Sequence, residues 1–304
     1  MLTVPCNLCG SSERRQIFPS TLDEADANPG AAFLCTHPGY GRHFAIVQCR
    51  QCGLVYANPR FDDDEILQHY GAAQDPLYLE ERRGRELTFQ RHLAPLLNVY
   101  GHWPAASERL LDVGCYIGVF VEVAGEAGWN AMGIEPSSWG TAEARKRGLN
   151  VIQGTLANSG LAADSFDVVT MWDVIEHVTD PMEVLRQAHN VLRSDGLLVL
   201  HTMDIGSPFA RLMGRRWPWL MEMHLYYFDR KTLRAMLEKA GFRLVRAEAQ
   251  GRYLRLGYLV TRVRPYSRMA AGVLNWLIER LGWRETAVPI NMGDLFTAYA
   301  QKVA

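Results

Sequence analysis

Residues 110–120 read LLDVGCYIGVF, and this stretch decides the fold. A short apolar run comes first, a glycine-bearing turn follows, and apolar residues then begin a helix. A strand, a glycine turn and a helix in this order are typical of the carboxyl edge of a parallel sheet, where nucleotide-like ligands bind. Glycine lets the backbone approach a ligand, and the helix N-terminus offers unpaired N–H groups. We therefore expect a ligand-binding loop at residues 114–118.

The alternation of strands and helices continues outward from this stretch. Short apolar runs that we expect to be strands occupy residues 110–113, 131–134, 149–152, 166–171 and 197–200. Helical segments separate them, the clearest being 183–192. A further helix and two more strands are expected at 230–240, 242–249 and 295–302. This order predicts an α/β fold, in which helices cover both faces of a parallel sheet.

An acidic residue ends the second predicted strand. Glu135 lies 17 residues after Gly118, where a carboxylate can accept hydrogen bonds from both hydroxyls of a ribose. A nicotinamide cofactor would share these features. Two details favour S-adenosylmethionine: the loop does not spell G-x-G-x-x-G, and Asp112 precedes its first glycine. A carboxylate there suits the cationic amino-acid end of that molecule, through ordered water, and would repel a pyrophosphate.

Four of the six cysteines form two C-x-x-C-G units, at 6–10 and 49–53, with 39 residues between the inner cysteines. Each unit can form a tight turn that points two thiolates at one position. The four thiolates supply the tetrahedral site that structural zinc prefers, and they belong to Cys6, Cys9, Cys49 and Cys52. Disulfides or free thiols are the alternative, and Cys35 and His37 are possible substitute ligands.

The composition is that of an ordinary globular protein: 304 residues, 48% of them hydrophobic and 21% charged, with a formal net charge of -1. It excludes a disordered chain, a collagen-like repeat and a coiled-coil rod. No apolar stretch approaches the ~18 residues of a membrane-spanning helix, and the start lacks the pattern of a signal peptide. We expect a soluble, cytoplasmic protein with a zinc-ribbon-like module at 1–60, a helical lead-in at 61–104 and an α/β domain at 105–304.

In their order, these motifs resemble those of the class I S-adenosylmethionine-dependent methyltransferases. More narrowly, they are similar to the subfamily with an N-terminal zinc-binding module, which includes sugar and natural-product methyltransferases. The matching stretches are LDVG at 111–114 with Gly118, GIEP at 133–136, FDVVTMWDVIEHV at 166–178, LRSDGLL at 192–198 and HLYYF at 224–228. The resemblance implies a Rossmann-like sheet, mostly parallel with its last strand antiparallel, a small zinc module and a helical insertion at 251–287.

The resemblance also implies an enzyme that transfers a methyl group from S-adenosylmethionine to a small molecule, with a sugar or a sugar-bearing or lipid-linked metabolite as the expected acceptor. An RNA-modifying methyltransferase and a non-catalytic S-adenosylmethionine-binding protein are the alternatives. Near-neutral charge and the lack of basic clusters around the cysteines disfavour RNA.

The cofactor-binding residues that the resemblance implies lie at the ends of the first four predicted strands. They are Asp112, Gly114, Cys115, Tyr116, Gly118, Glu135, Pro136, Thr155, Leu156, Trp172 and Asp173. Tyr116 stands where the family has its middle glycine. Gly154-Thr155-Leu156 stands where the family often has an acid, so contact with the adenine is expected only from Thr155 and Leu156.

Methyl transfer requires an oriented acceptor and a base for its proton. His224 is the first candidate, because it lies between aromatic segments on the link between the fifth strand and the 230–240 helix. Tyr227 is expected to orient the acceptor, and His177 is the second candidate. The alternative for both histidines is a buried, hydrogen-bonded core position.

Residues 252–284 carry seven arginines and one acid, interleaved with apolar residues. Three interpretations are open: a helical lid, a surface for anionic or lipid-linked substrates, and a helix that lies on a membrane surface. In the helical lead-in, Tyr70 and Tyr78 could close over the cofactor or form part of an ordinary amphipathic helix face.

Overall fold

A seven-stranded sheet forms the centre of the protein in the computed structural model, which describes residues 1–22, 33–37 and 39–303. Its strand order is β10-β13-β8-β7-β4-β5-β6. The bounds are β4 (Arg109–Val113), β5 (Asn130–Glu135), β6 (Val151–Gln153), β7 (Phe166–Trp172), β8 (Leu192–Met203), β10 (Phe242–Ala249) and β13 (Leu295–Lys302). Strands β4 to β8 are mutually parallel, and β13 is antiparallel to both of its neighbours. The expected sheet is confirmed.

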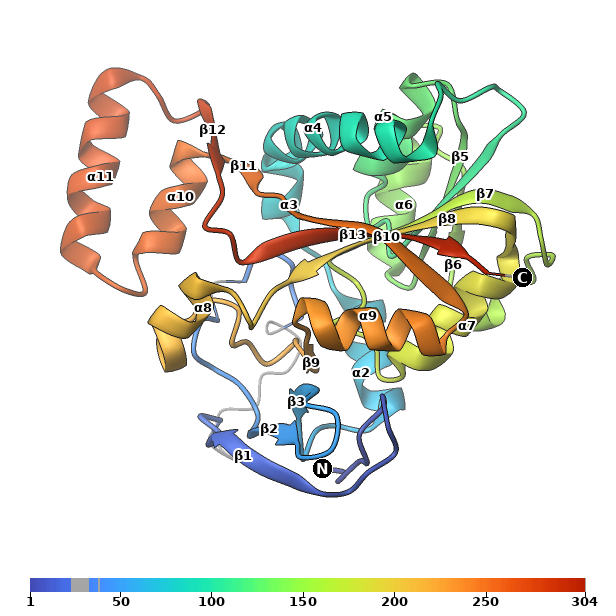
Figure 1. Ribbon diagram of the computed structural model, residues 1–304. Coiled ribbons are helices and arrows are strands. Elements are labelled where there is room, and N and C mark those ends of the chain that lie inside the picture. The colour runs from blue at the N-terminus through green and yellow to red at the C-terminus, as the bar shows by residue number, and fades with distance from the viewer. Residues whose placement is uncertain (23–32, 38, 304) are drawn as a thin grey trace.

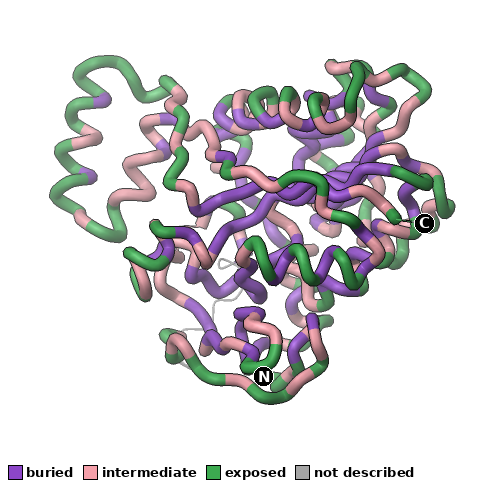
Figure 2. Tube along the Cα trace, viewed as in Figure 1, coloured by how far each residue is buried: buried purple, intermediate pink, exposed green. Residues whose placement is uncertain are grey.

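Helices cover both faces of this sheet, and its strands form the buried centre of the molecule (Figures 1 and 2). One face carries α4 and α5, and the other carries α7 and α9. The bounds are α4 (Arg82–Tyr100), α5 (Val119–Glu126), α6 (Ser138–Lys146), α7 (Pro181–Val191) and α9 (Arg230–Lys239). The chain order reverses at β4, which pairs with β5 on one side and with β7 on the other. In open α/β sheets the ligand cleft lies at such a reversal, beyond the carboxyl ends of the strands.

The N-terminal module shares a sheet with the rest of the chain. Strands β1 (Arg14–Phe18), β2 (Ile46–Cys49) and β3 (Val55–Ala57) pair antiparallel, and β9 (Tyr226–Tyr227) completes the order β1-β2-β3-β9. Because β9 lies in the link between β8 and α9, this sheet crosses the boundary expected at residue 60. Three helices follow the module: α2 (Asp63–Ala72), α3 (Pro76–Glu80) and then α4.

The insertion begins and ends in a two-stranded sheet. Between β11 (Arg252–Arg255) and β12 (Ala287–Ile290) lie α10 (Leu256–Val263) and α11 (Arg268–Leu281), which project from one end of the molecule (Figure 1). The helices match the expectation of a helical insertion. The two strands were not predicted, because each is only four residues long and too short to form a recognisable pattern of apolar residues. Two short elements, α8 (Pro208–Met213) and β9, occupy the β8–α9 link. Within the described ranges, no helix is long and apolar enough to cross a membrane.

Candidate active site

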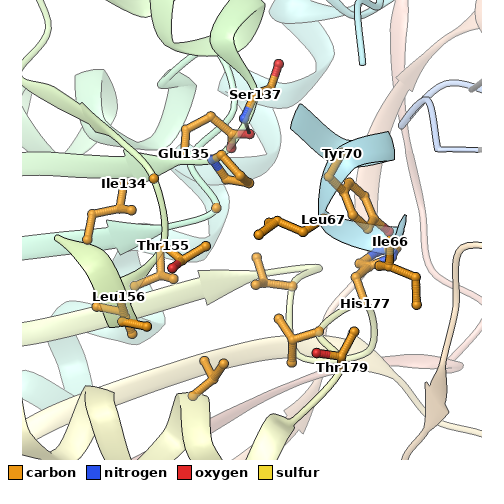
Figure 3. Close-up of a pocket in the computed structure, with 18 of the residues that line it drawn as sticks. Ile66, Leu67, Tyr70, Ile134, Glu135, Ser137, Thr155, Leu156, His177 and Thr179 are labelled. Carbon is orange, nitrogen blue, oxygen red and sulfur yellow. Dashed lines mark hydrogen bonds between the residues drawn. The ribbon is translucent and has the colours of Figure 1, made fainter. Parts of the chain in front are cut away.

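A cavity of about 390 Å³ lies at the carboxyl ends of β4, β5 and β7. The residues that line it include seven of the predicted cofactor-binding residues: Gly114, Tyr116, Glu135, Pro136, Thr155, Leu156 and Asp173. Helix α2 supplies the opposite wall, and Figure 3 shows Leu67 lying between Glu135 on one side and Tyr70 on the other. The predicted loop and Glu135, the last residue of β5, therefore meet at one cavity.

The loop after β4 has a backbone that only some residues tolerate. Gly114 has φ +70°, and a Cβ there would lie 2.6 Å from Cγ2 of Val174, so glycine is required. Tyr116 also adopts a positive φ, of 47°, and its ring packs edge-on against Tyr78 with the ring centroids 4.6 Å apart. This packing holds a bulky residue in a left-handed conformation that costs it roughly 1–2 kcal/mol.

Glu135 is buried with both carboxylate oxygens held by backbone amides. The amide of Tyr116 donates to Oε2 at 2.8 Å, and the amide of Ser137 donates to Oε1 at 2.7 Å. Burial raises the pKa of Glu135 to about 7, against the lowering effect of these two hydrogen bonds. Each oxygen has a second lone pair, so the carboxylate can still accept from two ligand hydroxyls.

Four of the predicted cofactor-binding residues lie elsewhere than on this cavity. Asp112 is buried behind the loop, where the Thr170 hydroxyl donates to its Oδ1 at 2.6 Å and burial raises its pKa to about 8. Cys115 and Gly118 also lie away from this cavity, since Cys115 packs in a cluster with Val121 and Ala144, and Ala144 also lies against Gly118. Trp172 lines a second cavity instead. Its side chain lies on the face of β7 opposite to that of Met171, because successive side chains of a strand point to opposite faces of the sheet.

The second cavity, of about 250 Å³, adjoins the first. Cys35 and Asp173 line both cavities. The second is otherwise walled by α4, by Trp219 on the β8–α9 link and by Tyr258 of α10. The insertion therefore forms part of the wall of a cavity, as the lid interpretation requires.

Asp173 lies where the two cavities meet and has a positive φ of 55°. Its Oδ1 accepts from Nη2 of Arg252 at 3.1 Å and lies 3.9 Å from Nε2 of His201. Burial alone would raise the pKa of Asp173, but these neighbours, Arg252 foremost, hold it at about 2. The side chain is therefore ionised at neutral pH and paired with the insertion.

His177 lies on the wall of the first cavity. Its Nδ1 is 2.7 Å from the Tyr70 hydroxyl and 3.0 Å from the Met223 carbonyl oxygen. Since a carbonyl only accepts, a proton on Nδ1 suits these contacts and leaves Nε2 with a free lone pair. Burial lowers the pKa of His177 to about 4, so the ring is neutral at pH 7.

His224 lies behind His177, with the ring centroids 4.7 Å apart, and it is not among the residues that line either cavity. Its Nδ1 donates to the Trp219 carbonyl at 2.7 Å, and burial lowers its pKa to about 3. A carboxylate oxygen of Glu176, a ring nitrogen of His177 and a ring nitrogen of His224 all lie within 4.8 Å of one another. Burial raises the pKa of Glu176 to about 8.

Tyr227 differs most from its predicted role. It pairs with Val55 in the N-terminal sheet, is fully buried, and donates from its hydroxyl to the Met221 carbonyl at 3.3 Å. Its hydroxyl is thus held inside the protein and away from both cavities, because β9 is fixed by long-range pairing that the local sequence does not reveal. The structure instead places Tyr70 at the first cavity, as the interpretation that it closes over the cofactor requires. Ser137 and Met223 also line this cavity, and no sequence motif had indicated them.

The four predicted metal ligands converge. The Sγ atoms of Cys6, Cys9, Cys49 and Cys52 all lie within 4.8 Å of one another. The Cys6–Cys52 and Cys9–Cys49 Sγ distances are 3.4 and 3.5 Å, too long for disulfides and close to the ~3.8 Å between sulfurs of tetrahedral zinc with Zn–S bonds of about 2.3 Å. Cys35 lies at the cavities instead. The donor set fits a closed, structural zinc site.

Comparison with known proteins agrees with this geometry. The sequence profile of a family described as a methyltransferase domain matches residues 80–247, more than half of the chain. Two curated ubiquinone biosynthesis O-methyltransferases are similar: one of Methylococcus capsulatus is 33% identical over 113 residues, covering 35% of this chain and 48% of the relative, and one of Actinobacillus pleuropneumoniae is 32% identical over 108 residues, covering 32% and 46%. The chain thus spans about half the length of the curated relatives it matches.

Among solved structures, a SAM-dependent methyltransferase from Archaeoglobus fulgidus aligns over 75% of this chain and 100% of its own, with 20% identity and a TM-score of 0.50. That likeness shows a shared fold. Together with the family match and the motifs along β4 to β8, it shows that the chain belongs to the methyltransferase domain family, with the class I S-adenosylmethionine-dependent fold.

Proposed function

We propose that this protein transfers the methyl group of S-adenosylmethionine to a small-molecule acceptor bound in the second cavity. The observation that carries the proposal is the junction at Asp173, where a cavity with the glycine loop and Glu135 meets a second cavity of acceptor size. When bound, S-adenosylmethionine supplies a methyl group already activated on a sulfonium sulfur. The protein then has to position the acceptor and accept its proton.

The residues of the first cavity suit that cofactor. The Glu135 carboxylate can accept from the ribose hydroxyls, and Thr155 and Leu156 lie on the same cavity wall, where the adenine contact was expected. Gly114 lies on the same cavity wall, with Val174 packed against its bare Cα. Helix α2, with Leu67 and Tyr70, covers the cavity and would exclude water from the reaction.

For the proton, the sequence favoured His224 over His177, and the positions of the two rings support the reverse order. His177 lines the first cavity and has a free lone pair on Nε2, while the His224 ring packs against the His177 ring on the side away from the cavity. Tyr70 would then orient the base through Nδ1. We propose His177 as the general base, with His224 as a positioning residue.

The acceptor is proposed to be a hydroxyl-bearing metabolite. The curated relatives are named O-methyltransferases of ubiquinone biosynthesis, which supports an oxygen acceptor on a small molecule. The aromatic and arginine side chains of the second cavity are compatible with a sugar-bearing or lipid-linked acceptor as well. A net charge of -1 gives no support to an RNA substrate.

The outer face of α11 is a second proposed site, one that contacts a partner outside the cavities. Its large apolar side chains are exposed at helical spacing: Met269, Val273, Trp276, Leu277 and Leu281. Exposed arginines flank them at positions 264, 268, 280 and 284, and Glu279 pairs with Arg284. A second copy on this face would bring like charges together, whereas an anionic bilayer complements them. We propose peripheral contact with such a bilayer.

The test of the catalytic proposal has two stages. Calorimetric titration with S-adenosylmethionine first measures cofactor binding by the wild type and by Glu135→Gln. The wild type is then incubated with a panel of catechols, sugar nucleotides and lipid-linked hydroxyl compounds, and S-adenosylhomocysteine release is followed. Cofactor binding together with release for one acceptor class is the expected result. Binding without release for any acceptor would favour a non-catalytic binding protein, and no binding would overturn the proposal.

A further inference from the structure

The second cavity contains a guanidinium with no anionic partner. Arg85 projects into it from α4, and none of the residues that the structure describes forms a hydrogen bond or ion pair with this side chain. Its Nε is buried and unsatisfied, and its guanidinium carbon lies 3.7 Å from the centroid of the Tyr78 ring. An aromatic face compensates a half-buried cation only in part. Arg85 therefore presents its guanidinium to the cavity without a paired carboxylate among the described residues.

The acids of this cavity are already engaged. Asp173 pairs with Arg252, and Glu81 pairs at 2.6 Å with Arg255 from outside the cavity. Asp294 accepts the indole N–H groups of two tryptophans, each at 2.9 Å. The charges of Asp173 and Glu81 act on Arg85 from a distance, but none of the three carboxylates forms an ion pair or hydrogen bond with it.

A second arginine of the cavity also has only neutral partners among the described residues. Arg262 of α10 donates to the carbonyl oxygens of Thr36 and His37 and to the hydroxyls of Tyr40 and Tyr258. These neutral groups bind its two Nη atoms, while its Nε is buried without a hydrogen-bond partner. The cavity is lined by three arginines and three carboxylates, but neither Arg85 nor Arg262 forms an ion pair with any of the three acids.

The rest of the lining is apolar and aromatic. Arg85, Thr88, Phe89 and His92 follow one face of α4 at helical spacing, and Trp219 belongs to the same lining. Burial lowers the pKa of His92 to about 4, so this ring adds no charge at neutral pH. A volume of about 250 Å³ suits a small ring better than an extended ligand. The cavity thus combines an apolar and aromatic lining with the guanidinium of Arg85, which no carboxylate pairs.

From this arrangement we infer that the methyl acceptor carries an oxyanion, a carboxylate or a phosphate, and that Arg85 binds it. The apolar part of the acceptor lies between Phe89 and Trp219, and its reacting atom points to Asp173, where the two cavities meet. Bidentate hydrogen bonding to a guanidinium suits either oxyanion. This inference rests on the proposed function, because it names the acceptor class of the same site.

The experiment measures binding of small probes to the 304-residue chain saturated with S-adenosylhomocysteine. Benzoate and phenyl phosphate are the anionic probes, benzamide is the neutral one, and ligand-observed NMR gives the dissociation constants. We expect the preferred anion to bind roughly tenfold or more tightly than benzamide, as a charge-assisted contact requires. Arg85→Met should abolish this preference and Arg85→Lys should keep part of it. Arg83→Met, at an exposed arginine of the same helix, should leave it unchanged.

The two anions separate the two sources of the oxyanion, since a carboxylate site prefers benzoate and a phosphate site prefers phenyl phosphate. Equal binding of benzamide and both anions, or an unchanged preference in Arg85→Met, would overturn the inference. S-adenosylhomocysteine affinity, measured for every variant, reports folding. It also separates the two proposals: if the cofactor product binds and the anions do not, only the anion site fails.

Discussion

The backbone amide of Tyr116 donates a 2.8 Å hydrogen bond to Oε2 of Glu135. This contact joins the loop after β4 to the end of β5, so the acid that would hold the ribose also fixes the loop that would hold the rest of the cofactor. Because Ser137 holds the other oxygen, the carboxylate is oriented before any ligand arrives. Binding should therefore need little rearrangement of this side chain.

Replacement of Glu135 should weaken cofactor binding strongly. Glu135→Ala removes the acceptor for two ribose hydroxyls, and hydrogen bonds to a charged group are worth about 1.5–3 kcal/mol. We expect roughly ten- to a hundredfold weaker binding of S-adenosylmethionine in calorimetry. Glu143→Ala is the control, since Glu143 lies on α6, pairs with Lys146 and does not line the cavity. Unchanged affinity in a folded Glu135→Ala protein would remove Glu135 from the site.

Cofactor affinity should depend on pH near neutrality. Burial raises the pKa of Glu135 to about 7, so below that pH the free protein carries a proton that must leave before the carboxylate can accept two hydroxyls. Affinity for S-adenosylhomocysteine should therefore fall as the pH drops from 8 to 6, approaching roughly tenfold per pH unit below the pKa. Glu135→Gln should show a flat profile over this range. A wild-type profile as flat as that of the variant would contradict the shifted pKa.

The two histidines should separate kinetically. His177→Asn should lower turnover by ~10²–10⁴, the usual contribution of a general base, with S-adenosylmethionine affinity within about twofold of wild type. Because the pKa of His177 is lowered to about 4 by burial, the base is already free at neutral pH, and the acid limb of kcat that it controls should lie well below pH 6.

His224→Asn should have the smaller effect, since His224 is proposed to act through His177, and Tyr70→Phe should also reduce kcat without a large change in KM. A normal rate in His177→Asn together with a large loss in His224→Asn would restore the order that the sequence suggested. Normal rates in both variants would mean that the acceptor needs no histidine base.

One equivalent of zinc per chain should be found by elemental analysis. Cys49→Ser should lose the metal and lower the melting temperature, because a structural zinc site contributes folding free energy. Cys35→Ser is the matched control, since Cys35 lies at the cavities and not in the thiolate cluster. Retention of zinc by Cys49→Ser, or its loss from Cys35→Ser, would show that the ligand set is different.

Contact of α11 with a membrane can be tested by co-sedimentation with phosphatidylcholine vesicles that contain or lack phosphatidylglycerol. The protein should co-sediment only with the anionic vesicles, and added salt should reduce the bound fraction. Trp276→Glu should reduce binding by roughly tenfold or more, whereas Trp103→Glu, at another exposed tryptophan, should not. A dimer that Trp276→Glu dissociates in light scattering would identify a second copy as the occupant of this face instead.

The central strands of the sheet could be predicted because each is a short apolar run between turn residues, and the edge strand β10 because it follows the helix stop at Gly241. β10 and β13 begin and end where the pattern places them. The site residues at the strand ends, such as Gly114 and Glu135, could also be predicted, because short local motifs mark them. Trp172 was expected to bind the cofactor but lines the second cavity, because proximity in sequence does not show which face of β7 a side chain occupies.

Other residues depended on contacts between distant segments. Tyr70 and Arg85 reach the cavities only because of how α2 and α4 dock, and helical spacing alone marks a face without saying what it meets. The position of Tyr227 follows from pairing between β9 and β3. Such long-range pairing has no local signature.

That pairing also bears on the order in which the protein can assemble. β3 and β9 are separated along the chain by most of the methyltransferase core, so the edge of the N-terminal sheet can be completed only after that core has brought residues 226–227 into place. The cysteine turns are local and can capture a metal early, but the sheet beside them closes late. A zinc-loaded N-terminal fragment made alone would therefore present β3 as an unpaired edge, open to pairing with other chains.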